Sequence, residues 1–173
     1  MGLLVERRLG CLPVVDVSGR LVGILTVADL VGELVRICAS AEGLGELDEV
    51  VAACMTEAPV TVDPRASVAE AIEICRAHGM RHLPVQSDGS FIGLVSDRDL
   101  RRSVGYRELE RKVEEIMTSD LVTVGPESLL SDAAELMQRL RVDSIPVTRE
   151  GRVVGILTTS DVLELMYAKL AHT

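Results

Sequence analysis

Aromatic residues are scarce in this sequence: its 173 residues include one Phe, two Tyr and no Trp, although 47% of them are hydrophobic. The core therefore has to be built from aliphatic side chains and Met. A flat ligand would also have to be held by aliphatic side chains, because aromatic rings for stacking are nearly absent. A chain of this length can bury one sizeable core or two small cores packed together.

Positive charge and long apolar runs are also lacking. The 18 Lys and Arg residues are outnumbered by 27 Asp and Glu residues, which gives a net charge of −9. This charge opposes binding to a phosphate backbone, and no local basic patch offsets it, so we expect no nucleic-acid partner. No apolar run approaches the roughly 20 residues of a membrane span, and the first residues lack a signal-peptide pattern, so we expect no membrane association.

Cysteine pairs and catalytic motifs are missing as well. The four cysteines are widely spaced and form no Cys-x-x-Cys motif, which favours reduced thiols in a cytoplasmic protein. The sequence contains neither a Gly-x-Ser-x-Gly nucleophile elbow nor a phosphate loop of the Walker type. We therefore expect that the protein is not an enzyme.

A short glycine-containing segment occurs three times in the chain, at residues 19–29, 89–99 and 151–161. Each copy reads as a turn, a branched-aliphatic strand and a Ser/Thr-x-x-Asp motif that begins a helix. The second and third copies belong to longer repeats that align without a gap over roughly fifty residues, with matching Gly and Pro positions. Such an alignment indicates two complete repeats of one structural unit.

The complete repeats span residues 51–104 and 114–168, and each is predicted to have the order β-α-β-β-α. In the first of them the predicted elements are a strand at 60–62, a helix from the capping box Ser67-x-x-Glu70 to Gly79, a strand from Leu83, a strand at 91–95 and a helix from Asp97. Residues 105–113 are predicted as a charged helical linker, and residues 169–173 as a tail.

The first copy, residues 1–30, is incomplete. Met1 aligns with Ile72, in the middle of a predicted helix, so the opening strand has no counterpart here. Residues 31–50 are predicted as a helical linker to the next repeat. The sequence leaves three roles open for residues 1–30: a packing element that covers an edge, the trimmed end of a longer four-repeat protein, or an element that pairs with a second chain.

The repeated pattern resembles that of the cystathionine-β-synthase (CBS) domain family. It consists of Met-Thr, Val-Thr-Val, Leu/Ile-Pro-Val, Gly, and Gly-hydrophobic-hydrophobic-Ser/Thr-x-x-Asp. The resemblance covers residues 51–166 fully and 1–30 partially. It implies an α+β (α/β) fold in which tandem β-α-β-β-α repeats pack as a pseudo-twofold pair, the Bateman module, with an incomplete repeat at the N-terminus.

The resemblance also implies a function. Such pairs bind adenosine compounds (AMP, ADP, ATP or S-adenosylmethionine) in clefts between repeats, regulate an enzyme or transporter, and tend to form homodimers. We therefore expect a regulatory adenosine ligand and no required cofactor. Two alternatives stay open: a structural dimerisation module with degenerate, empty pockets, or the detached regulatory tail of a larger enzyme or transporter.

The residues themselves suit an adenosine ligand. A strand that runs into a helix N-terminus offers free N–H groups and a positive dipole end to a phosphate, and a carboxylate three residues on can accept protons from ribose hydroxyls. The predicted ligand-binding residues are Ser96 and Thr158 (phosphate or ribose), Asp99 and Asp161 (ribose), Thr61, Leu83, Pro84, Thr123, Ile145 and Pro146 (base), and His82 and Arg98 (charge). The same Ser/Thr-x-x-Asp motif is also a helix cap, and the two roles are compatible.

The two predicted sites differ in charge. Arg81, His82 and Arg98 lie near the phosphate end of the first site, and their counterparts in the second are Asp143, Ser144 and Ser160. We hypothesise that the first complete repeat prefers AMP or another adenine nucleotide. The second would then hold a less charged adenosine compound or remain empty. The alternative is that these are solvated surface charges.

Cys75, His78 and His82 have a spacing typical of metal ligands on a helix. However, Cys75 and His78 align with Met137 and Leu140 in the next repeat. This alignment predicts that both lie on the helix face that packs on the sheet, and it disfavours a zinc site.

Overall fold

The computed structural model describes residues 2–7, 9–39, 49–103 and 108–170. The chain divides into two compact units. The first unit comprises residues 1–55, 127–144 and 157–173, and the second comprises residues 56–126 and 145–156. The second complete repeat is thus shared: its helices belong to the first unit and most of its strand residues to the second.

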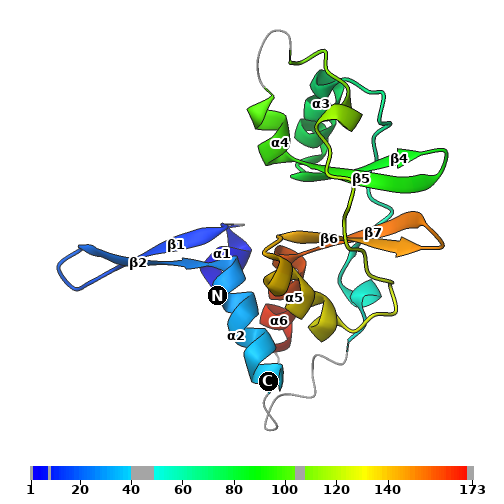
Figure 1. The fold of residues 1–173 in the computed structure, drawn as a ribbon. Helices are drawn as coiled ribbons and strands as arrows, with labels where there is room; N and C mark the ends of the chain where they lie inside the picture. The colour runs from blue at the N-terminus through cyan, green and yellow to red at the C-terminus, as the bar shows by residue number, and fades with distance from the viewer. Residues whose placement is uncertain (1, 8, 40–48, 104–107, 171–173) are drawn as a thin grey trace. The chain divides into compact units, whose positions relative to one another are not determined.

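Helices and strands follow the predicted order (Figure 1). They are α1 Gly2–Glu6, β1 Cys11–Val15, β2 Leu21–Thr26, α2 Val27–Ala39, the 3-10 helix η2 Val51–Ala53, β3 Thr56–Glu57, α3 Val68–His78, β4 His82–Ser87, β5 Ser90–Ser96, α4 Asp97–Arg102, the 3-10 helix η3 Val113–Glu115, α5 Leu130–Leu140, β6 Ser144–Arg149, β7 Arg152–Thr158 and α6 Thr159–Leu170.

In the first unit, α1 and α2 of the incomplete copy pack against α5 and α6 of the second complete repeat. Leu4, Val31 and Leu163 are almost fully buried there. Gly32 in α2 permits close approach, because a Cβ at this position would lie 2.2 Å from the side-chain nitrogen of Gln138. That nitrogen donates to the carbonyl oxygen of Ala28 at 3.1 Å. The N-terminal residues, whose alignment begins in the middle of a predicted helix, form α1 and contribute to a shared helical core.

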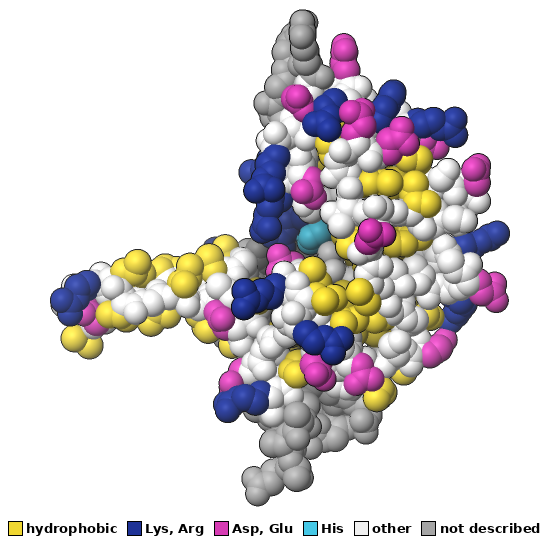
Figure 2. All heavy atoms as spheres, in the orientation of Figure 1, with side chains coloured by type: hydrophobic (Ala, Val, Ile, Leu, Met, Phe, Trp, Pro, Cys, Tyr) yellow, Lys and Arg dark blue, Asp and Glu magenta, His cyan; other side chains and the backbone are white. Residues whose placement is uncertain are grey.

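The β1–β2 hairpin of the first unit carries hydrophobic side chains on its surface (Figure 2). Its two strands pair antiparallel, with a register irregularity between Val14 and Val15. Of the linker predicted at 31–50, α2 accounts for the part up to Ala39. Residues 40–48 lie outside the described residues.

In the second unit, α3 begins and ends as predicted. Ser67 accepts a hydrogen bond from the N–H of Glu70, the carboxylate of Glu70 accepts one from the N–H of Ser67, and Gly79 closes the helix with φ +64°. Helix α3 buries Val68, Ala71 and Cys75 in a core shared with β4 and β5. Local sequence thus specifies where this helix begins and ends.

The predicted opening strands are much shorter than expected. Within segments 60–62 and 122–124, only Val62 and Val124 form bridges, to Val85 and Val147 respectively, both parallel. Val62 donates to the carbonyl oxygen of Pro84 at 3.0 Å and accepts from Gln86 at 3.0 Å. Two residues after Val62 the chain turns at a proline, so the pairing is limited to a single residue.

Each Met-Thr segment pairs with the last strand of the other complete repeat. In the second unit, Thr56 of β3 pairs antiparallel with Ile156 of β7. Thr118, at the equivalent position 62 residues on, forms an antiparallel bridge with Leu94 of β5, with N···O distances of 2.9 and 3.0 Å. The two complete repeats therefore exchange their lead-in segments.

The exchange extends to the helix N-termini. In the second unit, Val68 at the start of α3 donates to the carbonyl oxygen of Arg111 at 2.9 Å, and Val113 donates to that of Ala66 at 2.9 Å. The lead-in of the second complete repeat thus satisfies N–H groups at the N-terminus of α3 that have no partner within the helix.

The first unit contains the same arrangement with the repeats interchanged. Leu130 at the start of α5 donates to the carbonyl oxygen of Glu49 at 2.8 Å, and Val51 donates to that of Ser128 at 2.9 Å. Each pair of residues is the equivalent, 62 positions apart, of a pair in the second unit. The lead-in of each complete repeat therefore caps the first helix of the other.

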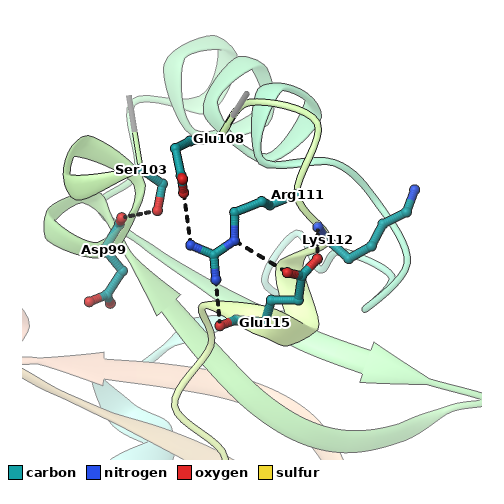
Figure 3. A network of polar contacts seen from close by, with 6 residues as sticks. All are labelled: Asp99, Ser103, Glu108, Arg111, Lys112 and Glu115. Atoms are coloured by element: carbon teal, nitrogen blue, oxygen red, sulfur yellow. Dashed lines mark hydrogen bonds and ion pairs between the residues drawn. The ribbon is translucent and has the colours of Figure 1, made fainter. Parts of the chain in front are cut away.

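The predicted helix in the linker is wrong for residues 108–112, which form a turn before η3. Carbonyl oxygens of this segment accept hydrogen bonds from the first N–H groups of α3, and Arg111 holds the turn closed (Figure 3). Its guanidinium group donates to the carboxylates of Glu108 at 2.8 Å and Glu115 at 3.3 Å. Residues 104–107 lie outside the described residues.

Within the described part of the chain, no helix has the length and apolar character needed to cross a membrane.

Candidate functional site

The Ser/Thr-x-x-Asp motif forms the same hydrogen-bonded cap in all three copies. In each, one carboxylate oxygen of the Asp accepts from the backbone N–H and the hydroxyl of the Ser or Thr, and the hydroxyl oxygen accepts from the N–H of the Asp. The three pairs are Thr26 with Asp29, Ser96 with Asp99 and Thr158 with Asp161. The capping role is thus present at every copy.

In the first complete repeat, the cap lies against the start of β4. The N–H of Asp97 donates to the carbonyl oxygen of Arg81 at 2.7 Å, and His82 is the strand partner of Ser96. Arg98 is exposed, whereas His82 and Asp99 are half-buried. The structure therefore brings the predicted phosphate and ribose residues of this repeat to one place at the N-terminus of α4.

The free oxygen of the cap is available to a ligand. Oδ2 of Asp99 makes the bonds to Ser96, and among the described residues no hydrogen bond is formed by Oδ1. Figure 3 shows the carboxylate pointing away from Ser103 and Arg111. A carboxylate oxygen held in this way can accept a hydroxyl proton without giving up its capping bonds.

The predicted base-binding residues of the same repeat differ in what they can offer. The side chain of Leu83 has no exposed surface and belongs to the hydrophobic core, so only its backbone is available to a ligand. Pro84 is also buried, and its carbonyl oxygen is already used by Val62. Thr61 is half-buried beside this contact. Leu83 and Val85 belong to the same core because side chains two residues apart on a strand point to one face of the sheet.

The predicted residues of the second complete repeat are divided between the units. In the second unit, the hydroxyl of Thr148 donates to that of Thr123 at 3.1 Å, and the N–H of Val124 donates to the carbonyl oxygen of Pro146 at 3.2 Å. Ile145 is 1% exposed and belongs to the core, like its equivalent Leu83.

In the first unit, Thr158 and Asp161 form the cap of α6. Burial raises the pKa of the Asp161 carboxyl above its ordinary value, and the hydrogen bonds from Thr158 oppose this shift only in part. By contrast, the hydrogen bonds from Thr26 lower the pKa of the exposed Asp29. The same motif therefore sits in two electrostatic environments.

Asp143 occupies the position of Arg81. Its carbonyl oxygen accepts from the N–H of Thr159 at 3.0 Å, as that of Arg81 does from Asp97. Both side chains are exposed, and Ser144, the counterpart of His82, is 7% exposed. The structure thus places opposite charges beside the starts of α4 and α6.

The described residues include a hollow in each unit. One, of about 550 Å³ and widely open, lies in the second unit and is lined by Thr61, Val62, Asp63, Ala66, Ala69, Glu70, Glu73 and Ile74. It includes Thr61 but not Pro84, Ser96 or Asp99. The other, of about 310 Å³, lies in the first unit and is lined by Ala28, Asp29, Val31, Met137, Gln138, Arg141, Val142, Asp143 and Thr159. Sequence reasoning missed it, because it depends on α2 packing beside α5.

Cys75 and His78 have a spacing typical of metal ligands, but they do not lie on the same face of α3. Cys75 is buried as predicted, whereas His78 is exposed, so the prediction that both pack on the sheet is wrong for His78. Helix α3 ends at this residue. Over the described ranges, no group of three or more His, Cys, Asp and Glu side chains could hold a metal ion.

Comparison with known families gives one match, which repeats along the chain. The family model for the CBS domain matches residues 1–36, 48–106 and 113–168, which together make up most of the sequence. The three matched segments correspond to the incomplete copy and the two complete repeats.

Among curated proteins, the chain is 38% identical over 104 residues to inosine-5′-monophosphate dehydrogenase from Korarchaeum cryptofilum. That match covers 60% of this chain but only 21% of the dehydrogenase. The chain is also 31% identical over 109 residues to the CBS domain-containing protein YhcV from Bacillus subtilis, a match that covers 62% of this chain and 78% of YhcV.

Solved structures agree with the fold. Protein MJ1225 from Methanocaldococcus jannaschii matches with a TM-score of 0.80 at 23% identity, over 95% of this chain and 62% of its own. The CBS domain pair of protein MJ0100, solved with 5′-methylthioadenosine and S-adenosyl-L-methionine, matches with a TM-score of 0.65 at 27% identity, over 70% and 98% of the two chains. CBSX2, solved with AMP, matches with a TM-score of 0.62 at 27% identity, over the same shares. The mixed helix-and-sheet fold class predicted from the sequence is confirmed.

Proposed function

The chain belongs to the CBS domain family, and from this premise we propose that it is a non-catalytic regulatory module that binds an adenosine compound. The observation that carries the proposal is the cluster at the N-terminus of α4. There Ser96 and Asp99 form a rigid cap beside the start of β4, and Arg81, His82 and Arg98 lie in the same place.

Each group has a chemical role in the proposal. Oδ1 of Asp99 accepts a proton from a ribose hydroxyl, while Oδ2 keeps the carboxylate fixed through Ser96. Arg98 and the neighbouring Arg81 supply positive charge for a phosphate. A guanidinium group suits this role because it can bind a phosphate through two parallel hydrogen bonds. Thr61 and the backbone of Leu83 and Pro84 contact the base.

The solved relatives support the ligand class. MJ0100 holds 5′-methylthioadenosine and S-adenosyl-L-methionine, and CBSX2 holds AMP. These compounds share the adenosine group and differ in charge at the 5′ position. We propose a charged adenine nucleotide (AMP, ADP or ATP) for the first complete repeat, because two arginines lie beside α4. For the second complete repeat we propose a less charged compound, such as S-adenosylmethionine, beside Asp143, Thr158 and Asp161. The reason is that the carboxylate of Asp143 repels a phosphate.

We propose that the protein forms a homodimer and that the partner it regulates is an enzyme or a transporter. The match to part of inosine-5′-monophosphate dehydrogenase supports an enzyme partner, because there a similar segment is one part of an enzyme chain. A ligand regulates such a partner only by binding its two conformations with different affinity.

A thermal melt with and without ligand tests the proposal. AMP, ADP, ATP and S-adenosylmethionine are added separately, and a specific ligand at a hundredfold excess over its Kd stabilises the fold by about 2.7 kcal/mol. We expect Asp99→Ala to abolish the shift with AMP, ADP and ATP and Arg98→Ala to weaken it, whereas the shift with S-adenosylmethionine should persist in both variants. Asp29→Ala is the matched control, because it removes the same cap in the incomplete copy. No shift with any compound would leave the structural dimerisation role as the better reading.

A further inference from the structure

The hollow between α2 and α5 of the first unit has the size of a small-molecule site. Its volume of about 310 Å³ is at the lower end of the range in which proteins bind small ligands. Its lining residues come from α2, from α5 and the residues that follow it, and from Thr159 at the start of α6 (Figure 1). All of these residues belong to the first unit, so one compact unit forms the whole hollow.

The innermost lining residues of this hollow are apolar. Val31 and Met137 are each 1% exposed, and Val142 beside them is half-buried. An aliphatic group that enters the hollow can therefore leave water by contact with these side chains. The residues that line the hollow include no aromatic ring, so a purine would find no stacking surface there.

The rim of the hollow carries charges of both signs. Arg141, Asp29 and Asp143 line it and are exposed. Over the described ranges, the side chains of Arg141 and Asp143 form no hydrogen bond or ion pair. Oδ2 of Asp29 accepts from Thr26, whereas Oδ1 accepts from no described residue. The rim thus offers one guanidinium group and two carboxylates whose bonding capacity is largely unused.

Arg141 occupies a position at which glycine is the less costly residue. It ends α5 with φ +55°, and its counterpart 62 positions earlier, Gly79, ends α3 with φ +64°. A residue with a Cβ costs free energy in this left-handed conformation, whereas glycine adopts it freely. The requirements of the helix end therefore do not explain an arginine here, but a role for its side chain in the hollow does.

We propose that the hollow binds a zwitterionic α-amino acid with an aliphatic side chain. The ligand carboxylate accepts two parallel hydrogen bonds from the guanidinium group of Arg141. The ligand ammonium group donates to Asp29 and Asp143, and the aliphatic side chain packs on Val31 and Met137. A phosphate is disfavoured, because two carboxylates face one arginine. The proposal shares only Asp143 with the residues proposed above for adenosine compounds, and it does not depend on them.

Equilibrium dialysis of the whole chain against radiolabelled L-leucine and L-methionine tests the proposal. We expect one bound amino acid per chain. Unlabelled L-leucinamide, which lacks the carboxylate, and 4-methylpentanoate, which lacks the ammonium group, should compete at least about tenfold more weakly than L-leucine. Each of them keeps the aliphatic group but loses charge-assisted hydrogen bonds.

Two substitutions test the charged groups. Arg141→Gly should raise the Kd for L-leucine at least about tenfold and leave the melting temperature without ligand unchanged or higher, because glycine suits the left-handed backbone. Asp29→Asn should also raise this Kd, although asparagine keeps an oxygen for the cap with Thr26. Arg139→Gln is the matched control, because Arg139 is exposed on α5 and does not line the hollow.

Four results would overturn the proposal. The first is no binding of either amino acid at a free concentration of about 1 mM. The second is competition by L-leucinamide as strong as by L-leucine. The third is wild-type affinity in Arg141→Gly. The fourth is displacement of L-leucine by AMP or adenosine, which would assign the hollow to adenosine compounds. None of the first three changes the melting shift expected from AMP at Asp99, so the two proposals fail separately.

Discussion

The hairpins β1–β2 and β4–β5 have the same pattern of residues and the same register, yet only β4–β5 is buried. Pro13 faces Ile24 in the first and Pro84 faces Leu94 in the second, and each hairpin has one register irregularity after the following valine. The exposed fraction is 63% at Ile24 and 8% at Leu94. The comparison teaches that a hairpin of this family forms from its own sequence, whereas its burial depends on the segments that pack against it, such as α3, which shares a core with β4 and β5.

The largest effect on stability is expected when the side chain is truncated at the matched position in β5, and the same change in β2 is its control. Leu94→Ala should lower the free energy of unfolding by about 3 kcal/mol, because it leaves a cavity beneath the lead-in of the opposite repeat. Ile24→Ala should change the free energy of unfolding by less than about 0.5 kcal/mol in the monomer, since its side chain is already in water. Urea denaturation at low protein concentration measures both, and equal losses would refute the difference in burial.

A smaller effect is expected from adding a methyl group to the matched glycines. Gly93→Ala should cost about 1–3 kcal/mol, because the new Cβ would lie 2.8 Å from the carbonyl oxygen of Thr118 and 2.9 Å from the sulfur of Met117. Gly23→Ala should be nearly neutral, because its nearest neighbour is 4.0 Å away. The two variants are compared by thermal unfolding. Destabilisation at Gly23 as large as at Gly93 would mean that β2 is also covered in the monomer.

The capping carboxylates of α2 and α6 also differ in how their contribution to stability depends on pH. Burial raises the pKa of Asp161, so its contribution to stability is present below the ordinary value of 3.8 and is lost as the pH rises through the folded pKa. The pKa of Asp29 is lowered, first by the Thr26 hydroxyl, so its contribution is present above 3.8 and is lost as the pH falls through its folded pKa. Carboxyl-detected NMR titration should find Asp161 above and Asp29 below that value. The reverse order would contradict the assigned environments.

The smallest effect is expected in thiol chemistry. Cys11 of β1 is exposed, whereas Cys75 of α3 is buried and burial raises the pKa of the Cys54 thiol to about 11. In a Cys38→Ser background, a thiol reagent at neutral pH should therefore modify Cys11 first, because reaction needs an accessible thiolate. Mass spectrometry of the labelled peptides identifies the site. Equal modification of Cys11 and Cys75 would contradict the difference in burial between the two thiols.

Local motifs could be predicted from the sequence with good accuracy. The capping box of Ser67 and Glu70, the end of α3 at Gly79, and the Ser/Thr-x-x-Asp caps all occur where the sequence indicates them. Each is satisfied by partners no more than about four residues away, which is why sequence spacing is sufficient. The gathering of His82, Ser96, Arg98 and Asp99 follows from the same local rules, because a hairpin brings its first and last residues together.

The predictions that the structure contradicts have a common cause. The predicted linker helix is wrong at residues 108–112 because carbonyl oxygens of this segment accept from the start of α3, about forty residues earlier in the chain. The opening strands shrink to single bridges, and Leu83, predicted to contact a ligand, lies in the core. None of these outcomes can be read from spacing, since each depends on which distant segment supplies a hydrogen-bond partner or covers a side chain.

By itself, the sequence determined the number of repeats, their order of helices and strands, and the three capped helix starts, because turn and cap hydrogen bonds form between near neighbours. Only the tertiary structure decided that the complete repeats exchange their lead-in segments, that Asp161 is buried while Asp29 is exposed, and that the edge of β2 is left open. Burial and edge pairing depend on residues far apart in the chain, and packing alone brings those residues together.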